Sequence, residues 1–427
     1  MSRLRNITTA LAAVLLTAPA FAYDIQMPGN DTKLSIYGFV YALANENLVG
    51  ATQTGTSDLI YQGAAGGLST SSNFTDNAKA PNNFLMNTSP SRYGFASTTP
   101  TAAFGDITTK IEMDLNGLNQ SSGNFHLRHA YATVGNFLFG QTFSVWDDLA
   151  AYPETINWQG AIGNPGFDTP RRYQMRYTIP FDKHNELKIS IEKNQGLDGD
   201  TYTAAGTAAA PNPTATTPAA VMNTKIPALV AAYTYSDSWG HIAAHGMAVQ
   251  HGEYIPATAG VASYGFTKES YAGLVSGDVK FGKDDFVFNV YTGQAIDDWG
   301  VGIQGAVFTN TVARPQAIDF YTSTGWSVGY THVFTPVWRA NIYTSGVKFK
   351  SNDNIATTTS GTGTDIKQFL DGGVNVFYTL TKSAQFGLEY YYETGKTFGA
   401  RSVMEQNGYT SDEARNGRIQ FLLQVNF

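Results

Sequence analysis

The sequence predicts an all-β protein, a transmembrane antiparallel β-barrel of about sixteen strands. Charged residues make up only 14% of the chain and aromatic residues 13%, with 43 glycines, whereas a typical soluble domain has about 25% charged residues. Beyond the N-terminus, no stretch approaches the roughly 18 consecutive apolar residues of a membrane-spanning helix. Apolar and polar residues instead alternate in many short segments, which is typical of strands with one polar and one apolar face.

The N-terminal residues 1–22 have the pattern of a secretory signal peptide. Arg3 and Arg5 precede a short apolar core, and an A-x-A cleavage motif ends at Ala22. We therefore expect export of the chain and a mature barrel of residues 23–427. Removing the two arginines from the 27 basic residues leaves 25 against 34 acidic residues, a formal net charge of −9, which argues against a nucleic-acid partner. Cysteine is absent, which excludes disulfides and thiolate chemistry.

Strict alternation identifies the strands. In the segment DITTKIEMDL, one face carries Ile107, Thr109, Ile111, Met113 and Leu115, and the other carries Asp106, Thr108, Lys110, Glu112 and Asp114. The final segment, RIQFLLQVNF, likewise ends with apolar residues in phase as far as Phe427. A period of two indicates strand rather than helix.

Over the whole chain, the pattern predicts sixteen strands. They are expected at residues 33–45, 90–98, 105–117, 124–135, 137–146, 171–181, 185–194, 226–237, 239–251, 267–281, 284–295, 322–334, 336–350, 367–381, 384–396 and 415–427. Most gaps after odd-numbered strands are long, and those after even-numbered strands are tight turns. Outer-membrane barrels show this asymmetry, with short periplasmic turns and long external loops. Both termini are then expected at the periplasmic end, and the gap 296–321 is long enough for a further hairpin.

Several motifs then resemble those of a known family. They follow in the order Arg128-His129-Ala130-Tyr131, a Gly turn with the strand segment Gly140-Gln141-Thr142, Pro153-Glu154, Trp158-Gln159-Gly160-Ala161-Ile162-Gly163 and Arg172-x-x-x-Arg176-Tyr177. Over roughly residues 90–195 this order resembles the DcaP-like porins, within the trimeric porins of Gram-negative bacteria. Phe427 resembles the terminal aromatic residue of outer-membrane insertion signals.

The resemblance implies a homotrimer of sixteen-stranded barrels in the cell outer membrane, in contact with membrane lipid and lipopolysaccharide. It also implies that the third external loop folds into the lumen, and the third long gap, 147–170, falls at this place. The implied function is passive diffusion of small hydrophilic solutes, with preference for anions such as dicarboxylates. No enzymatic activity, cofactor or metal is expected. Some relatives carry a periplasmic helical segment before the barrel, whereas here only residues 23–32 precede the first strand.

Alternation assigns the arginines of the segment PRRYQMRYTIP to the lumen. Tyr173, Met175, Tyr177 and Ile179 share one face, and Arg172, Gln174, Arg176 and Thr178 share the other. An arginine that faces lipid at mid-depth costs about 2–4 kcal/mol, so the apolar set is expected to face lipid. Arg171 lies where the strand begins.

The same argument turns further cations toward the lumen, namely Arg128, Lys188, Arg339 and Arg418, and Arg92, which opens its strand, can join them. The family resemblance implies that the loop carboxylates Asp147, Asp148 and Glu154 face them at the constriction. Arginines that face carboxylates across a narrow neck favour solutes with carboxylate groups, which guanidinium binds in a bidentate manner. Alternatively, the arginines only neutralise the loop and hold it in place, and the two roles are compatible.

The histidines and exposed aromatic residues have simpler interpretations than a metal or sugar site. His241, His245 and His251 share a face, but in-phase strand residues lie about 6.6–7 Å apart, too far to chelate one ion easily. We expect them to be polar groups of the pore wall or of an interface. His129 has outward parity and is expected at a subunit interface. Trp239, Tyr291, Trp326 and Tyr390 are expected in aromatic girdles, with a sugar-stacking path as the alternative.

Two other functional classes remain open. A barrel-embedded hydrolase requires a Ser–His pair on adjacent strands, and the sequence shows no recognised nucleophile or zinc motif. A non-conducting structural or adhesive barrel has the same alternation.

Overall fold

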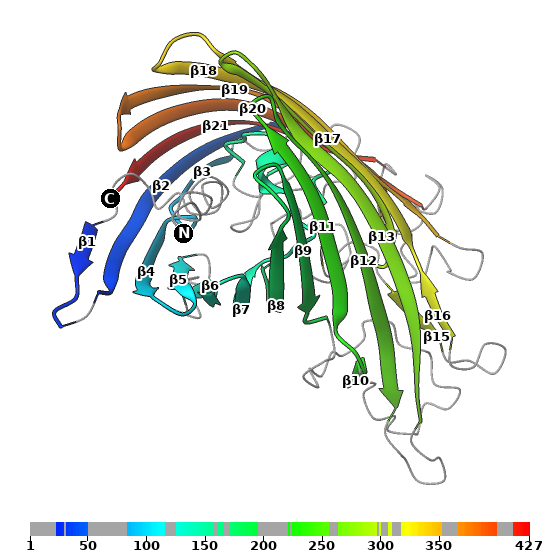
Figure 1. Ribbon diagram of the computed structural model, residues 1–427. Helices are drawn as coiled ribbons and strands as arrows, with labels where there is room; N and C mark the ends of the chain where they lie inside the picture. Colours follow the sequence, from blue (N-terminus) through cyan, green and yellow to red (C-terminus); the bar gives the residue numbers. More distant parts are fainter. Residues whose placement is uncertain are drawn as a thin grey trace.

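Sixteen antiparallel strands form a closed barrel in the computed structural model of the chain (Figure 1). In order around the barrel they are β2 (Lys33–Val49), β4 (Arg92–Thr101), β5 (Gly105–Asp114), β6 (His126–Val134), β7 (Phe137–Phe143), β8 (Arg171–Pro180), β9 (Asn185–Glu192), β11 (Ala228–Asp237), β12 (Gly240–Ile255), β13 (Tyr264–Phe281), β14 (Asp284–Gln294), β17 (Thr322–Val333), β18 (Trp338–Lys350), β19 (Ile366–Thr381), β20 (Ala384–Thr397) and β21 (Glu413–Asn426). Because β2 pairs with both β4 and β21, the ring is closed.

The structure describes most of the chain, and every structural statement concerns this part. The described residues are 23–29, 31–49, 83–115, 125–157, 160–161, 163–165, 171–194, 221–222, 224–255, 264–296, 299, 306–309, 317–351, 366–398 and 413–427. The predicted signal peptide, residues 1–22, lies outside them and stays a prediction.

All sixteen predicted segments coincide with the barrel strands, which confirms the predicted fold. The gap 296–321 does hold a hairpin, formed by β15 (Ala306–Thr309) and β16 (Ala317–Phe320), which belongs to a separate two-stranded sheet. Three short strands were not predicted: β1 (Tyr23–Gln26), β3 (Asn83–Asn87) and β10 (Val221–Met222). They are too short for alternation to identify.

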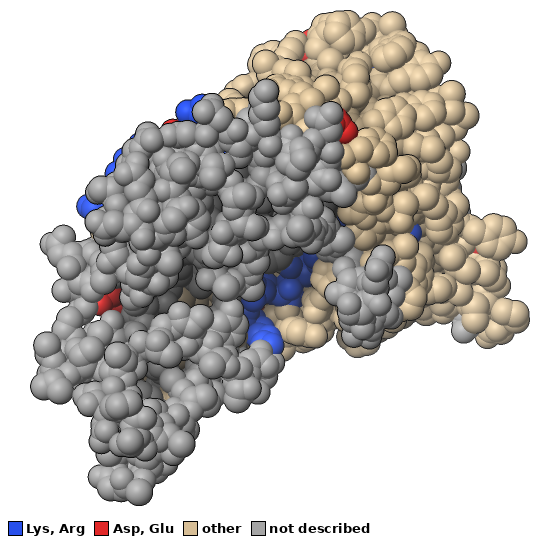
Figure 2. Space-filling view, turned by 180° about the vertical axis from the view of Figure 1, so that it is seen from behind, with Lys and Arg blue, Asp and Glu red and all other residues tan. Residues whose placement is uncertain are grey.

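The two faces of the barrel differ as the alternation predicts. On β14 and β18, the outward side chains Val290 and Ile342 are 54% and 57% exposed in the isolated chain, whereas the inward Asn289 and Ser345 are 0% exposed. The outer surface of the described wall carries few charged side chains (Figure 2). An apolar outer belt around a polar interior is the arrangement of membrane barrels. Among the described residues, no helix is long and apolar enough to cross a membrane.

The C-terminus takes part in closing the ring. The backbone N–H groups of Gly38 and Phe427 each donate to the other residue's carbonyl oxygen, at 3.0 and 2.9 Å. The Phe427 ring occupies the space where a Cβ atom on Gly38 would lie. The terminal aromatic residue is therefore built into the seam between β2 and β21.

Candidate functional site

The connection between β7 and β8 folds into the barrel, and its described residues 144–157, 160–161 and 163–165 are called the inserted loop below. It contains the short 3-10 helix η1 (Leu149–Ala151), which lies within the ring of strands (Figure 1). At its start, the Glu192 carboxylate on β9 accepts hydrogen bonds from the Ser144 hydroxyl (2.7 Å) and the Val145 N–H (2.9 Å). Nδ1 of His245, on β12, lies 2.9 Å from the Val145 carbonyl oxygen. The predicted insertion of the third external loop is therefore confirmed.

The middle of the loop is held by β12 and β13. The Asp148 carboxylate accepts a hydrogen bond from Ser276 (2.6 Å) and lies 2.7 Å from Nε2 of His241. His241 contacts Asp278 through Nδ1, so one imidazole joins a loop carboxylate to a wall carboxylate. The neighbouring Asp147 accepts from the Tyr152 hydroxyl (3.2 Å). Burial raises the pKa of Asp147 well above its ordinary value, and the nearby Glu192 charge adds to this rise.

Farther along, Glu154 forms a bidentate pair with Arg339 of β18. Its two oxygens accept from Nε and Nη2 at 2.8 and 2.5 Å, and the Asn341 amide donates at 3.2 Å. The Arg339 guanidinium also lies 4.4 Å from the ring centroid of Phe377. Of the predicted arginine and loop-carboxylate partners, the structure thus brings this pair together.

A second wall carboxylate binds the loop backbone. Glu389, on β20 and 0% exposed, accepts from the N–H groups of Ile156 (2.8 Å) and Asn157 (3.1 Å). It also accepts from the side-chain amides of Asn375 and Gln420, each at 2.9 Å. Four donors converge on this one buried carboxylate, which makes it a strong anchor of the loop.

The loop then turns back along β17 and β18. Gly160 has a φ of 85°, which favours glycine. At Gly163 the loop approaches the wall so closely that a Cβ atom would collide with backbone atoms of Trp326 and Gly346. The Gly163 N–H donates to Ser345 at 2.8 Å. The two glycines of the motif Trp158 to Gly163 therefore permit the turn and the close contact.

Replacing Gly163 with alanine is expected to displace the loop, because backbone atoms cannot move aside as a flexible side chain can. Overpacking of this kind costs about 1–3 kcal/mol. We expect faster proteolytic cleavage within the loop, while heat-modifiable migration on gels shows that the barrel still folds. Gly246→Ala is the control, since its Cβ atom would meet nothing within 4 Å. Equal cleavage rates for the two variants would contradict the prediction.

The arc of strands β4–β9 holds most of the arginines. These six strands contain seven basic and five acidic residues: Arg92, Lys110, Arg128, Arg171, Arg172, Arg176 and Lys188 against Asp106, Glu112, Asp114, Glu186 and Glu192. They hold five of the eight arginines in the barrel strands. This arc is therefore richer in guanidinium groups than the rest of the wall.

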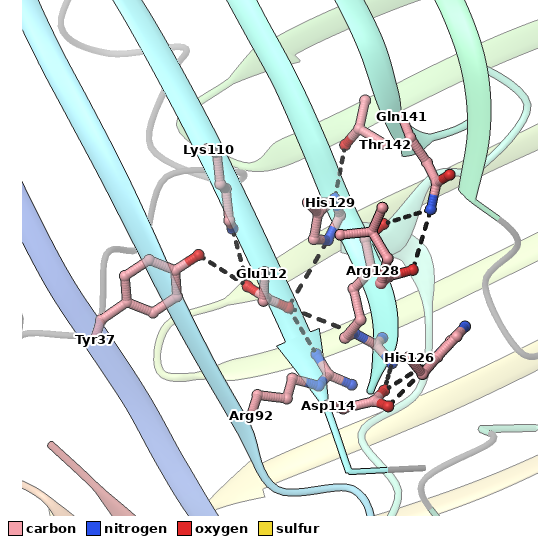
Figure 3. A network of polar contacts seen from close by, with 11 residues as sticks. Tyr37, Arg92, Lys110, Glu112, Asp114, His126, Arg128, His129, Gln141 and Thr142 are labelled. Carbon is pink, nitrogen blue, oxygen red and sulfur yellow. Dashed lines mark hydrogen bonds and ion pairs between the residues drawn. The ribbon is translucent and has the colours of Figure 1, made fainter. Parts of the chain in front are cut away.

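Two of the predicted cations, Arg92 and Arg128, lie in a network on this arc (Figure 3). Glu112 lies 3.8 Å from Arg92 and 3.4 Å from Arg128 and accepts from the Tyr37 hydroxyl at 3.0 Å. Arg128 also pairs with Asp114 at 2.5 Å. The predicted partners of these arginines were loop carboxylates, and their ion-pair partners in this network are instead carboxylates of the wall.

The prediction that His129 faces outward is wrong. It is 4% exposed, contacts Thr142 at 3.0 Å and lies 3.9 Å from Glu112. The register between β5 and β6 shifts between Glu112 and Met113, so Arg128 is an extra residue in the pairing. This bulge lets Arg128 and His129 both approach Glu112 (Figure 3).

The remaining predicted cations have separate surroundings, and Arg172, Arg176, Lys188 and Arg418 have the parity of the inward residues, as predicted. Arg171 lies over the Phe143 ring (5.8 Å), Arg172 over Trp299 (4.6 Å) and Arg418 over Tyr391 (4.6 Å). Lys188 pairs with Glu186 at 2.7 Å. Arg176 shares a face of β8 with Gln174, which is 5% exposed. The opposite face carries Tyr173, Met175 and Tyr177, which are 55%, 50% and 38% exposed.

Sequence reasoning missed the anchors Glu192 and Glu389 and the buried Trp299. The parity that assigned the arginines also turns both glutamates inward, so that signal was present.

Among the described residues, no group of three or more His, Asp or Glu side chains could hold a metal. The girdle assignment of Tyr291 is wrong, because it is 6% exposed within an interior apolar cluster; Trp239 and Tyr390 are 39% and 44% exposed.

Comparison with known proteins agrees with this architecture. Residues 17–216 match the family described as DcaP outer membrane protein. The crystal structure of the outer membrane channel DcaP of Acinetobacter baumannii is similar with a TM-score of 0.71 and 20% identity, over 94% of this chain and 99% of that chain. The anion-selective porin of Comamonas acidovorans gives 0.55 and 9% (93% and 100% covered), and the trimer form of OmpT of Vibrio cholerae gives 0.52 and 12% (93% and 99%). No curated protein sequence matches the chain.

Proposed function

We propose that this chain, a β-barrel of the outer membrane similar to the DcaP family, is a passive channel for small hydrophilic solutes that favours anions such as dicarboxylates. The proposal rests on one arrangement. The inserted loop binds Glu192 of β9 at its start, the inner wall from β12 to β20 and Tyr41 of β2, whereas five of the eight arginines of the barrel strands lie on the arc β4–β9. Solutes that pass beside the loop would then meet a wall rich in guanidinium groups.

The charge at this neck supports a preference for carboxylates. Asp148 and Glu154 of the loop are each bound by wall side chains, so neither carboxylate faces the arginines of the arc unpaired. Guanidinium binds carboxylate through two parallel hydrogen bonds, which favours solutes with carboxylate groups over anions that cannot accept two such bonds. The net charge of the whole chain, −7 with the N-terminal segment included, does not decide selectivity, because the neck charges act at close range.

We also propose that the channel is a homotrimer in contact with lipid and lipopolysaccharide. Support comes from the fold it shares with OmpT of Vibrio cholerae, for which a trimer form has been solved.

The experiment is single-channel recording of the purified protein in a planar bilayer. We expect discrete conductance steps and a reversal potential of the anion-selective sign under a salt gradient. A folded barrel that gives no steps would contradict the channel and favour a structural or adhesive role. A barrel-embedded hydrolase would instead show turnover that a single Ser or His substitution abolishes.

A further inference from the structure

Trp299 reaches the barrel interior from the connection between β14 and β17. Directly after β14, Ala295 adopts a φ of 45°, which non-glycine residues rarely do. Its N–H donates to the Tyr321 carbonyl at 3.0 Å, and the Trp299 N–H donates to Ile296 at 3.0 Å. The Trp299 side chain is 0% exposed and belongs to the same apolar cluster as Val145 and Trp146 of the inserted loop.

The indole contacts two strands of the arginine-rich arc. Its Nε1–H donates to Glu192 of β9 at 2.7 Å, and the Arg172 guanidinium of β8 lies over its ring at 4.6 Å. Glu192 is the same carboxylate that binds Ser144 and Val145 of the inserted loop. One wall carboxylate thus holds the start of that loop and the indole of a second connection.

A guanidinium stacked on an indole is attracted by the negative face of the ring, and the stacked face is closed to other molecules. Solutes can then approach Arg172 only from its other sides. The hydrogen bond to Glu192 fixes the orientation of the indole and therefore its cover over Arg172.

We propose that Trp299 is a specificity-determining residue of the channel, which limits the contact of anionic solutes with Arg172. This inference rests on the proposed channel function. Replacing Trp299 with alanine would open the covered face, so that anions come closer to the charge.

The first test measures access to Arg172 and needs no conduction. The rate at which phenylglyoxal modifies Arg172 in the folded, detergent-solubilised protein is followed by peptide mass spectrometry. We expect faster modification in Trp299→Ala than in the wild type, and a wild-type rate in Trp299→Phe, which keeps a ring over the guanidinium. Trp146→Ala is the control, because it removes the other fully buried indole of the same cluster. An Arg172 rate that is unchanged in Trp299→Ala, or raised equally in Trp146→Ala, would overturn the proposal.

The second test is a double-mutant cycle on the reversal potential. We expect Trp299→Ala to raise the anion-to-cation permeability ratio about twofold, the factor for an anion that approaches one charge at ~5 Å instead of ~10 Å in water. The same substitution in an Arg172→Ala background should leave the ratio unchanged, because coupled residues are not additive. An equal rise in both backgrounds would show that Trp299 does not act through Arg172. A wild type without channels would refute the proposed function, and the modification rates would still decide whether Trp299 shields Arg172.

Discussion

Glu389→Ala is expected to loosen the inserted loop at Ile156 and Asn157 and to raise single-channel conductance. The substitution leaves the loop N–H groups of Ile156 and Asn157 and the Gln420 amide without this acceptor, while the Asn375 amide still donates to the Glu154 carbonyl oxygen. Each buried group left unsatisfied costs about 1–3 kcal/mol, so the loop loses several kcal/mol of its attachment. We therefore expect larger and noisier current steps.

Glu393→Ala is the matched control for this experiment. Glu393 lies four residues after Glu389, on the same face of β20, and is equally buried. It accepts hydrogen bonds from Tyr391 and Asn416 of the wall. Both variants lose one buried carboxylate, so a general loss of stability would affect them alike. If both show the same rise in conductance, or neither does, Glu389 is not the anchor that narrows the channel. Glu389→Gln, which keeps one acceptor oxygen, should lie between the wild type and the alanine variant.

The double substitution Arg172→Ala/Arg176→Ala is expected to lower the anion-to-cation permeability ratio. One unit charge at ~10 Å in water contributes about 0.4 kcal/mol. Screening at 0.1 M salt reduces this contribution about threefold. Removing two charges then changes anion and cation entry in opposite directions, which gives a fall of about threefold in the ratio. The measurement is the reversal potential across a salt gradient.

Lys348→Ala/Arg415→Ala removes the same amount of charge from the external ends of β18 and β21. Both residues alternate with the inward set, and Arg415 is 61% exposed. This control should leave the ratio near that of the wild type. An unchanged ratio in the Arg172/Arg176 variant would show that these arginines hold the neck rather than select solutes, and would leave the channel itself intact.

The barrel could be predicted from sequence because alternation is a local property of each strand. Strand parity correctly predicted that Arg172 and Arg339 face inward. The prediction is well determined because a shift of one residue in the strand would place their charges in lipid. Parity failed at His129, where the bulge at Arg128 shifts the register, and a bulge leaves no clear local signal in the sequence.

The partners of the inserted loop could not be predicted in the same way. Ile156 and Glu389 are 233 residues apart in sequence, and Asp148 and His241 are 93 apart. Strand alternation predicts that a glutamate side chain faces the interior. Which loop atom it binds depends on the three-dimensional arrangement of the closed barrel. Tyr291 was misplaced for a related reason, because an inward tyrosine packed among other rings has the same composition signal as one in a girdle.

The distribution of the loop's anchors along the chain also determines the order of assembly. The anchors on β9, β12, β18 and β20 all follow the loop in sequence, and Gln420, which braces Glu389, lies close to the C-terminus. Contacts between distant residues form late because the ends of the intervening chain must first be brought together. The loop cannot complete its attachment until β20 and β21 have joined the sheet. We therefore expect the neck to take its final form only after the ring of strands has closed.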